Sequence, residues 1–197
     1  MQLIYVGGRM NMSGFEVKPL SIPGILEIRP QRYLDERGFF SEVWREDWQE
    51  QLGLRTRFVQ DNHSFSKSRG VLRGMHFQKP PAAQDKLVRV ARGSIFDVAV
   101  DIRRGSSTFG RWAGVVLSSS EWNQLFIPKG FAHGFVTLED DTEVLYKVSE
   151  LYSPKHDNAI RFDDPAVGID WPIGFEGLIV SPKDRTAPLL FEMDTGF

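Results

Sequence analysis

The chain of 197 residues carries 24 Lys and Arg against 26 Asp and Glu, a formal net charge of -2, and contains no cysteine. A nearly balanced charge without a basic cluster argues against a nucleic-acid partner, and the absence of cysteine excludes disulfides and thiol chemistry. The apolar runs are too short for a membrane span and the first residues lack the pattern of a signal peptide, so we expect a cytoplasmic protein without a membrane partner.

Composition and length favour one all-β domain. Fifteen Phe, five Trp and four Tyr accompany 18 Gly and 11 Pro, a balance that suits strands and turns better than helical bundles. We predict a single jelly roll over residues 1–197, that is, an antiparallel β-sandwich or barrel with a few short helices. Residues 1–25 are expected to form an N-terminal arm that is loose or pairs with a neighbour. Residues 152–197, rich in Pro, Asp and Gly, are expected to be wrapping loops and a C-terminal segment.

The first part of the chain predicts short strands and a polar pocket wall. Residues 26–30 predict a strand, residues 35–47 run from a polar turn into an aromatic strand, and residues 46–52 predict one or two helical turns before Gly53. Residues 57–66 also read as a strand, but its centre is unusually polar: Gln60, Asp61, Asn62 and His63. A polar strand centre indicates that these side chains line a pocket.

The central part of the chain holds the strongest catalytic candidate. Residues 71–78 predict a strand that must stop at the following proline pair, because proline cannot donate ladder hydrogen bonds. Residues 86–91 and 95–102 predict two more strands joined by a Gly-Ser turn. We expect these strands to bring His76 within reach of Lys86.

Later strands continue the antiparallel pattern. Residues 109–118 alternate as a strand, and residues 124–128 lead into the segment GFAHGF. Residues 135–139 and 142–150 flank Asp140-Asp141, which predicts a hairpin turn.

Four histidines are candidates for acid–base chemistry, because imidazole titrates near neutral pH. His76 stands out, since Arg73, Gln78 and Lys86 place a polar cluster around it in a β core, although a lone strand histidine is often structural. His63 is equally well a supporting or surface residue. We expect His156, in a Pro- and Asp-rich loop, to be solvated.

The segments around His76 and His133 resemble the two motifs of the cupin superfamily, which normally supply several metal ligands. Gln78 replaces the second histidine of the first motif, and the expected glutamate falls on Ala82 or Ala83. Two imidazoles without a carboxylate are a poor transition-metal site. We therefore expect no metal and no other cofactor.

Without a metal, the candidate residues suit proton transfer at a carbon next to a carbonyl. This reaction needs a base, a cation or donor to hold the enolate oxygen, and an acid on the opposite face if the centre is to invert. His76, Lys86 and Tyr146 can fill these roles. A carboxylate that accepts a hydrogen bond from the imidazole would fix its tautomer, but the spacing of residues in the sequence does not identify which carboxylate this is.

Seven ordered blocks across residues 26–183 resemble the dTDP-4-dehydrorhamnose 3,5-epimerase family: RGFFSE, FVQDNHS, GVLRGMHFQ, QDKLVRVARGSIFDVAVDIR, FGRWAGVVLS, IPKGFAHGF and LYKVSELYSP. The resemblance implies a metal-free cupin jelly roll, usually a homodimer that exchanges N-terminal strands. It also implies action on dTDP-4-dehydro-6-deoxy-D-glucose in L-rhamnose biosynthesis, without a cofactor. The 4-keto group of that substrate activates both C3 and C5.

The resemblance also implies roles for individual residues. Four match catalytic positions: His76 as base, Tyr146 as proton donor, Lys86 near the ketone, and Asp184 as partner of the base. Eight match substrate-binding positions, some of which would reach a partner subunit's site: Arg37, Glu42, Gln60, Asn62, Arg73, His133, Asp157 and Lys183. Asp157 departs from the family pattern, which has Glu, and is shorter by one methylene.

One geometric condition accompanies these assignments. In a regular strand Arg73 and His76 point to opposite faces, so both can face one site only if Gly74 supplies a bulge or kink.

Three alternatives remain open at this stage. The nearest is a 3- or 5-mono-epimerase of dTDP-4-keto-6-deoxyhexoses in antibiotic-sugar biosynthesis, which shares these motifs. A metal cupin such as an oxygenase would require stoichiometric iron. A silent sugar-nucleotide binding module would not need an acid and a base together.

Overall fold

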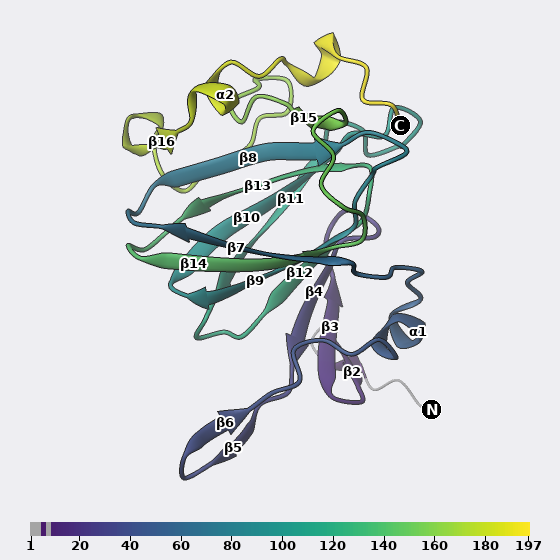
Figure 1. The fold of residues 1–197 in the computed structure, drawn as a ribbon, viewed down its shortest axis with the longest axis vertical. Helices are drawn as coiled ribbons and strands as arrows, with labels where there is room; N and C mark the ends of the chain where they lie inside the picture. The colour runs from purple at the N-terminus through teal and green to yellow at the C-terminus, as the bar shows by residue number, and fades with distance from the viewer. Residues whose placement is uncertain (1–4, 7–8) are drawn as a thin grey trace.

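The computed structural model describes residues 5–6 and 9–197, and its strands form two large antiparallel sheets that face each other (Figure 1). The larger sheet has eight strands, in the spatial order β1 (Tyr5–Val6), β2 (Arg9–Met12), β3 (Phe15–Pro19), β4 (Leu26–Pro30), β12 (Gln124–Ile127), β9 (Lys86–Arg92), β14 (Thr142–Val148) and β7 (Gln60–Ser66). The smaller sheet has the order β11 (Trp112–Ser118), β10 (Ser94–Asp101), β13 (Phe131–Thr137), β8 (Val71–Gln78) and β15 (Asp157–Ala159), with β16 (Ile179–Val180) pairing in parallel with β8. This is the predicted all-β, cupin-type jelly roll.

Helical structure within the described residues is confined to short segments. These are α1 (Trp48–Leu52), α2 (Pro182–Arg185) and the 3₁₀ turns η1 (Phe175–Gly177) and η2 (Leu190–Glu192). Helix α1 ends at Gly53, whose φ of 66° gives the left-handed C-cap that glycine adopts without strain. In the described part of the chain, no helix has the length and apolar character needed to cross a bilayer.

Three hydrophobic clusters hold the layers together, and one of them joins β3 and β4 to Trp48 of α1. Of the other two, the first lies between the sheets and contains inward residues such as Val88, Phe135 and Val144. The second lies on the outer side of the smaller sheet, where Val98 packs with Trp171 from the C-terminal segment. The C-terminal segment, yellow in Figure 1, therefore covers that sheet and brings α2 against β8.

The hairpin predicted at Asp140-Asp141 is wrong, whereas the turn predicted at Gly93 does join two consecutive strands. The turn at Gly93 joins β9 to β10, and Asp140-Asp141 joins β13 to β14, but in both cases the two strands lie in different sheets. Alternation in a sequence identifies a strand and its two faces, not the strand that will pair with it. The left-handed φ of 79° at Gly93 lets the chain cross between the sheets within one residue.

A bulge in β8 meets the condition on Arg73 and His76. His133 of β13 pairs with His76 and Phe135 pairs with Arg73, so three steps along β8 oppose two along β13. Gly74 lies within this bulge at a φ of 141°, and a Cβ there would collide with the backbone of Gly134. The predicted irregularity is confirmed, and Arg73 and His76 both line the interior cavity described below.

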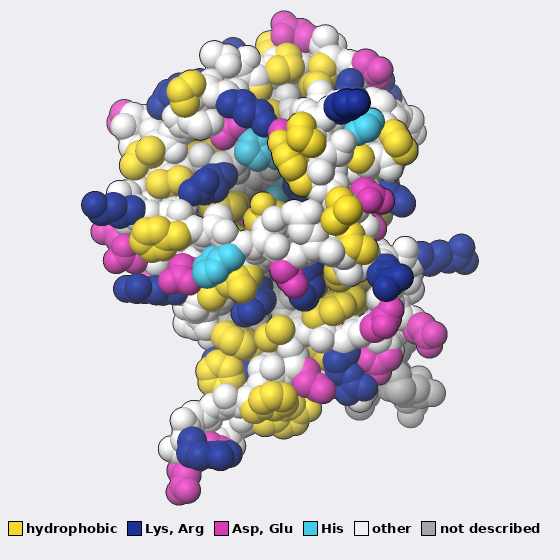
Figure 2. Space-filling view, viewed as in Figure 1, with side chains coloured by type: hydrophobic (Ala, Val, Ile, Leu, Met, Phe, Trp, Pro, Cys, Tyr) yellow, Lys and Arg dark blue, Asp and Glu magenta, His cyan; other side chains and the backbone are white. Residues whose placement is uncertain are grey.

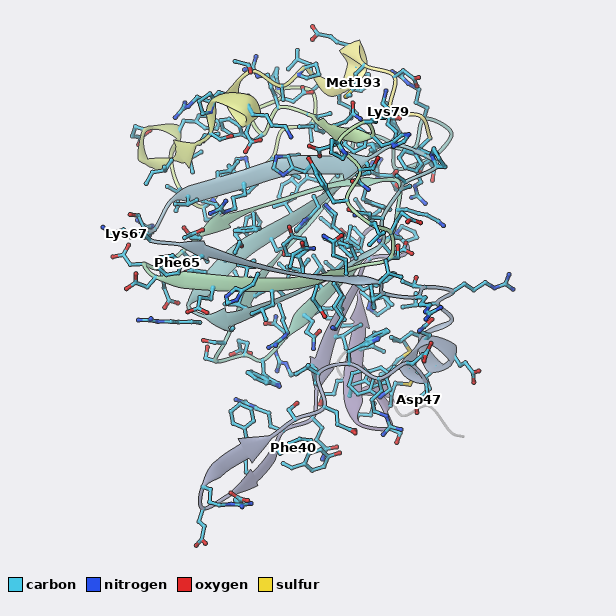
Figure 3. The ribbon with its side chains drawn as sticks, in the orientation of Figure 1. Phe40, Asp47, Phe65, Lys67, Lys79 and Met193 are labelled. Carbon is cyan, nitrogen blue, oxygen red and sulfur yellow. The ribbon has the colours of Figure 1, made fainter. Side chains whose placement is uncertain are left out.

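The hairpin of β5 (Tyr33–Asp35) and β6 (Gly38–Phe40) projects from the end of the molecule opposite the C-terminal segment (Figure 1). Phe40, labelled in Figure 3, lies on this projection together with other exposed apolar side chains: Tyr33, Leu34 and Phe39. At the N-terminus, where an arm was expected, β2 pairs with β3 and β3 with β4 of the same chain.

Candidate active site

A cavity of about 620 Å³ opens between the two sheets, and its lining joins β7 and β14 of the larger sheet to β8 of the smaller one. Figure 2 shows it as a hollow in the face of the molecule, with histidine and cationic side chains around it. Ten of the residues singled out from the sequence line it: Gln60, Asn62, Arg73, His76, Lys86, His133, Tyr146, Asp157, Lys183 and Asp184. Residues more than 100 positions apart in the sequence therefore meet in one site.

His76 and Asp184 form a hydrogen-bonded pair, with 2.6 Å between Nε2 and Oδ1. Asp184 lies on α2, where its backbone N–H donates to the hydroxyl of the N-cap Ser181. Burial by itself would raise the pKa of Asp184, but its hydrogen bond to His76 and the smaller one to Ser181 bring that pKa below its usual value. The carboxylate thus stays ionised and holds the imidazole in one orientation.

Lys86 is the buried cation of the cavity. Its Nζ donates to the backbone oxygen of His76 at 3.2 Å, and only 8% of the residue is exposed. Burial lowers the pKa of Lys86 to about 8, although the charges of Asp97 and Asp157 oppose this shift. The ammonium is therefore charged at neutral pH but close to losing its proton.

Tyr146 comes from the opposite sheet to His76. It lies on β14 and shares the inward face with Val144 and Val148. Burial raises the pKa of its phenol, an effect that Arg73 partly offsets. At neutral pH the phenol keeps its proton, so the cavity carries an imidazole on one wall and a proton donor on the other.

A second histidine–carboxylate pair lies beside the first. His133 is the cross-strand neighbour of His76, and its Nε2 lies 2.6 Å from Oδ1 of the fully buried Asp97. Burial lowers the pKa of His133, with Asp97 opposing the shift. Asp97 was not among the site residues predicted from the sequence. An aspartate at an inward position of a buried strand was the available signal.

Asp157 joins two other cavity-lining residues, Lys183 and Tyr152, through hydrogen bonds. Lys183 donates to Asp157 at 2.6 Å, and this hydrogen bond raises the pKa of Lys183. The Tyr152 hydroxyl reaches the same carboxylate at 3.3 Å, so Asp157 engages both partners despite being shorter than the expected glutamate. Tyr152 was missed as a site residue, although it belongs to the quoted block LYKVSELYSP.

Arg73 lies on β8, and its side chain reaches the end of β7 in the larger sheet. Its guanidinium donates to the Ser66 hydroxyl at 3.3 Å and to the backbone oxygen of Phe65 at 3.0 Å. Two of its nitrogens are thereby fixed, which aims the group across the gap between the sheets.

Two predicted binding residues lie outside this cavity. Arg37, at the tip of the β5–β6 hairpin, has an 85% exposed side chain and pairs with Asp35. Glu42 pairs with Arg45 at 3.2 Å near α1. Neither lines the cavity of its own chain.

The residues present do not fit a metal site. The Nε2 atoms of His76 and His133 are both engaged by aspartates, and the cationic Lys86 lies in the same cavity. Gln78, in the position of the missing histidine, bonds the backbone instead. No cluster of three or more His, Asp or Glu suited to a metal ion occurs among residues 5–6 and 9–197.

The other two histidines lie outside this constellation. His63 is on the outer face of β7 and bonds Glu143 at 3.0 Å, which fits the surface interpretation. His156 is partly buried rather than fully solvated, because its Nδ1 lies 2.8 Å from the Ser153 hydroxyl.

Comparison with known proteins points to the same family as the sequence motifs, over most of the chain. Residues 19–192 match the family model described as dTDP-4-dehydrorhamnose 3,5-epimerase. A protein of that name from Methanothermobacter thermautotrophicus is 52% identical over 175 residues, which cover 88% of this chain and 94% of the relative.

Solved structures match equally well. A dTDP-6-deoxy-D-glucose-3,5-epimerase from Legionella pneumophila, crystallised with dTDP-4-keto-L-rhamnose, has a TM-score of 0.87 and 47% identity over 91% of this chain and 95% of its own. ChmJ, a 3'-monoepimerase from Streptomyces bikiniensis in complex with dTDP-quinovose, has a TM-score of 0.81 and 35% identity over 88% and 87% of the two chains. Fold, cavity and sequence agree, and the chain belongs to the dTDP-4-dehydrorhamnose 3,5-epimerase family.

Proposed function

We propose that this chain epimerises dTDP-4-dehydro-6-deoxy-D-glucose at C3 and C5 to give dTDP-4-dehydro-L-rhamnose, a step of L-rhamnose biosynthesis. One observation carries the proposal: the His76–Asp184 pair and the protonated Tyr146 phenol lie on opposite walls of a cavity that also holds the buried Lys86. Inversion next to a ketone requires this combination of base, acid and cation.

His76, oriented by Asp184, removes the proton from C5 or C3. The electron pair of the broken C–H bond forms a double bond from that carbon to C4, and the π electrons of the C4 carbonyl move onto its oxygen. Lys86 stabilises the negative charge on this enolate oxygen. Tyr146 then donates its proton to the same carbon from the opposite face, which inverts it. Solvent restores the phenol proton and takes the proton from the imidazolium. The reaction is redox-neutral and needs no cofactor.

Eight residues would bind the rest of the substrate. Arg73 and Arg37 suit the diphosphate, because a planar guanidinium makes bidentate contacts with phosphate oxygens. The other six are assigned to the sugar and nucleoside: Glu42, Gln60, Asn62, His133, Asp157 and Lys183.

The proposal includes a homodimer that exchanges N-terminal strands and acts in the cytoplasm. The β5–β6 hairpin supports the proposal of a partner subunit, because an isolated two-stranded hairpin is only marginally stable in water. Its side chains Leu34 and Phe40 are 78% and 67% exposed, and a partner would cover them. Arg37 and Glu42, which lie outside their own chain's cavity, would then complete the cavity of the partner. The whole chain of 197 residues forms the single jelly-roll domain of each subunit.

The test is incubation with dTDP-4-dehydro-6-deoxy-D-glucose in heavy water, with and without added chelator, followed by NMR. The proposal expects deuterium with inversion at both C3 and C5 under both conditions. No exchange at either carbon, while a known epimerase converts the same substrate, would refute it.

A 3- or 5-mono-epimerase is the second candidate, and the similarity to ChmJ favours it specifically. The same NMR measurement separates the two, because a mono-epimerase inverts only one carbon.

A further inference from the structure

The loop between β14 and β15 closes one side of the cavity mouth. Its residues 150–153 pass from the larger sheet towards the smaller one, and Tyr152 of this loop lines the cavity. The backbone of these four residues is held by glutamine side chains from outside the loop. This arrangement has no part in the proton transfer described above.

Gln78 makes the most extensive of these contacts. Its Nε2 donates to the backbone oxygens of Ala82 at 2.7 Å and Leu151 at 3.2 Å, and its Oε1 accepts from the backbone N–H of Ser153 at 2.7 Å. The residue is 4% exposed, so the amide of Gln78 itself is shielded from water and depends on these backbone partners. One buried amide therefore ties the end of β8, the following turn and the mouth loop together.

Two further glutamines hold the neighbouring positions. Gln60 accepts from the N–H of Tyr152 at 3.0 Å and donates to Asn62 at 2.8 Å. Gln84 donates to the backbone oxygen of Glu150 at 2.8 Å from a more exposed position. The mouth loop is thus hydrogen-bonded to β7 through Gln60 and to β8 through Gln78, which lies two positions after the base His76.

The substrate orientation gives this loop a role. A sugar that reacts at His76 lies beside the buried Lys86, and the rest of the cavity available to its nucleotide is lined in part by Tyr152 of the mouth loop. We propose that Gln78 is a positioning residue that fixes the mouth loop, residues 150–153, and thereby sets the affinity for the nucleotide part of the substrate. The inference rests on the proposed function and assigns Gln78 to binding rather than to proton transfer.

The test is Gln78→Met, which keeps the side-chain length and removes the amide. We expect KM for the keto sugar and the Kd for dTDP alone to rise about 10-fold or more, the effect of losing a buried hydrogen bond, while kcat changes by less than about threefold. Gln84→Met is the matched control, because it removes one exposed contact to the same loop, and it should change both constants by less than about threefold. A fall in kcat with unchanged KM, or no change in either constant, would overturn the proposal.

Hydrogen exchange of the wild-type protein provides a second measurement that does not depend on the variant folding. The Ser153 amide should be protected in the absence of nucleotide, and exchange at the rate of an exposed amide would also overturn the inference. The dTDP titration separates the two proposals. Wild-type protein that binds dTDP but exchanges no deuterium into the sugar contradicts the epimerase, and the binding constants still test Gln78.

Discussion

Replacing Lys86 with methionine should raise stability while removing activity. The lysine is buried, and burial lowers its pKa from 10.5 to about 8. A shift of this size makes the charged lysine cost about 3 kcal/mol of folding free energy at pH 7, where it is protonated in both the folded and unfolded states. Methionine fills similar space without the charge, and loses one hydrogen bond to His76 that is worth about 1 kcal/mol. Lys86→Met should therefore be more stable by about 2 kcal/mol at pH 7.

The sign of the pH dependence follows from the direction of the shift. Between pH 8 and 10.5 the folded protein releases the Lys86 proton before the unfolded chain does, so the unfolded state binds more protons and wild-type stability rises relative to the variant. The charging cost falls to about 1 kcal/mol at pH 10, where the stability advantage of the variant should have nearly disappeared.

Urea unfolding of both proteins at pH 7 and pH 10 measures this difference, and epimerisation assays accompany it. We expect the variant to lose about 10²- to 10³-fold in kcat because the enolate oxygen has lost its cation. A variant that is less stable than wild type by the same amount at both pH values would refute the reasoning about the buried charge.

Three further predictions follow from the same cavity. Asp184→Asn keeps the shape of the carboxylate but removes its charge, so kcat should fall about 10³- to 10⁴-fold, as steady-state kinetics would reveal; a loss under tenfold would contradict its role in orienting His76. Asp97→Asn removes a charge that raises the pKa of Lys86. In a pH–rate profile, the alkaline fall in kcat, expected near pH 8 in wild type, should therefore move to lower pH. An unchanged alkaline fall would contradict the electrostatic effect of Asp97 on Lys86. Gly74→Ala adds a Cβ that meets the backbone of Gly134 at a positive φ, so chemical denaturation should show a loss above about 2 kcal/mol, and a neutral effect would contradict the tight bulge.

Much of the fold followed from local sequence signals. Of the polar centre of residues 57–66, Gln60 and Asn62 line the cavity, whereas Asp61 and His63 are exposed on the other face of β7. Residues three positions apart face opposite sides of a regular strand, and this rule located the bulge at Gly74 between Arg73 and His76. The pairing of strands did not follow, because the turns at Gly93 and Asp140-Asp141 serve crossings between sheets as well as they serve hairpins. Register between distant strands depends on the whole sandwich.

The residues of the cavity likewise fall into those that local sequence identified and those that depend on distant partners. Histidine chemistry picked out His76 from local composition, but its partner Asp184 lies 108 positions away, and only family resemblance indicated it. Asp97 and Gln78 were not recognised as working residues, because their partners come from other strands and from loop backbone. Arg37 lies on an exposed hairpin outside the cavity of its own chain, so only the proposed homodimer gives it a place in a binding site.

The central claim is that His76 removes the proton and Tyr146 returns one from the other face. The most direct test is NMR of the keto sugar in heavy water with Tyr146→Phe and His76→Ala, each alongside wild type. Tyr146→Phe should still wash deuterium into C3 or C5 but without inversion, because the imidazole can return deuterium to the face it came from. His76→Ala should bind dTDP normally and exchange nothing. Exchange that persists in His76→Ala, or inversion that persists in Tyr146→Phe, would contradict the account.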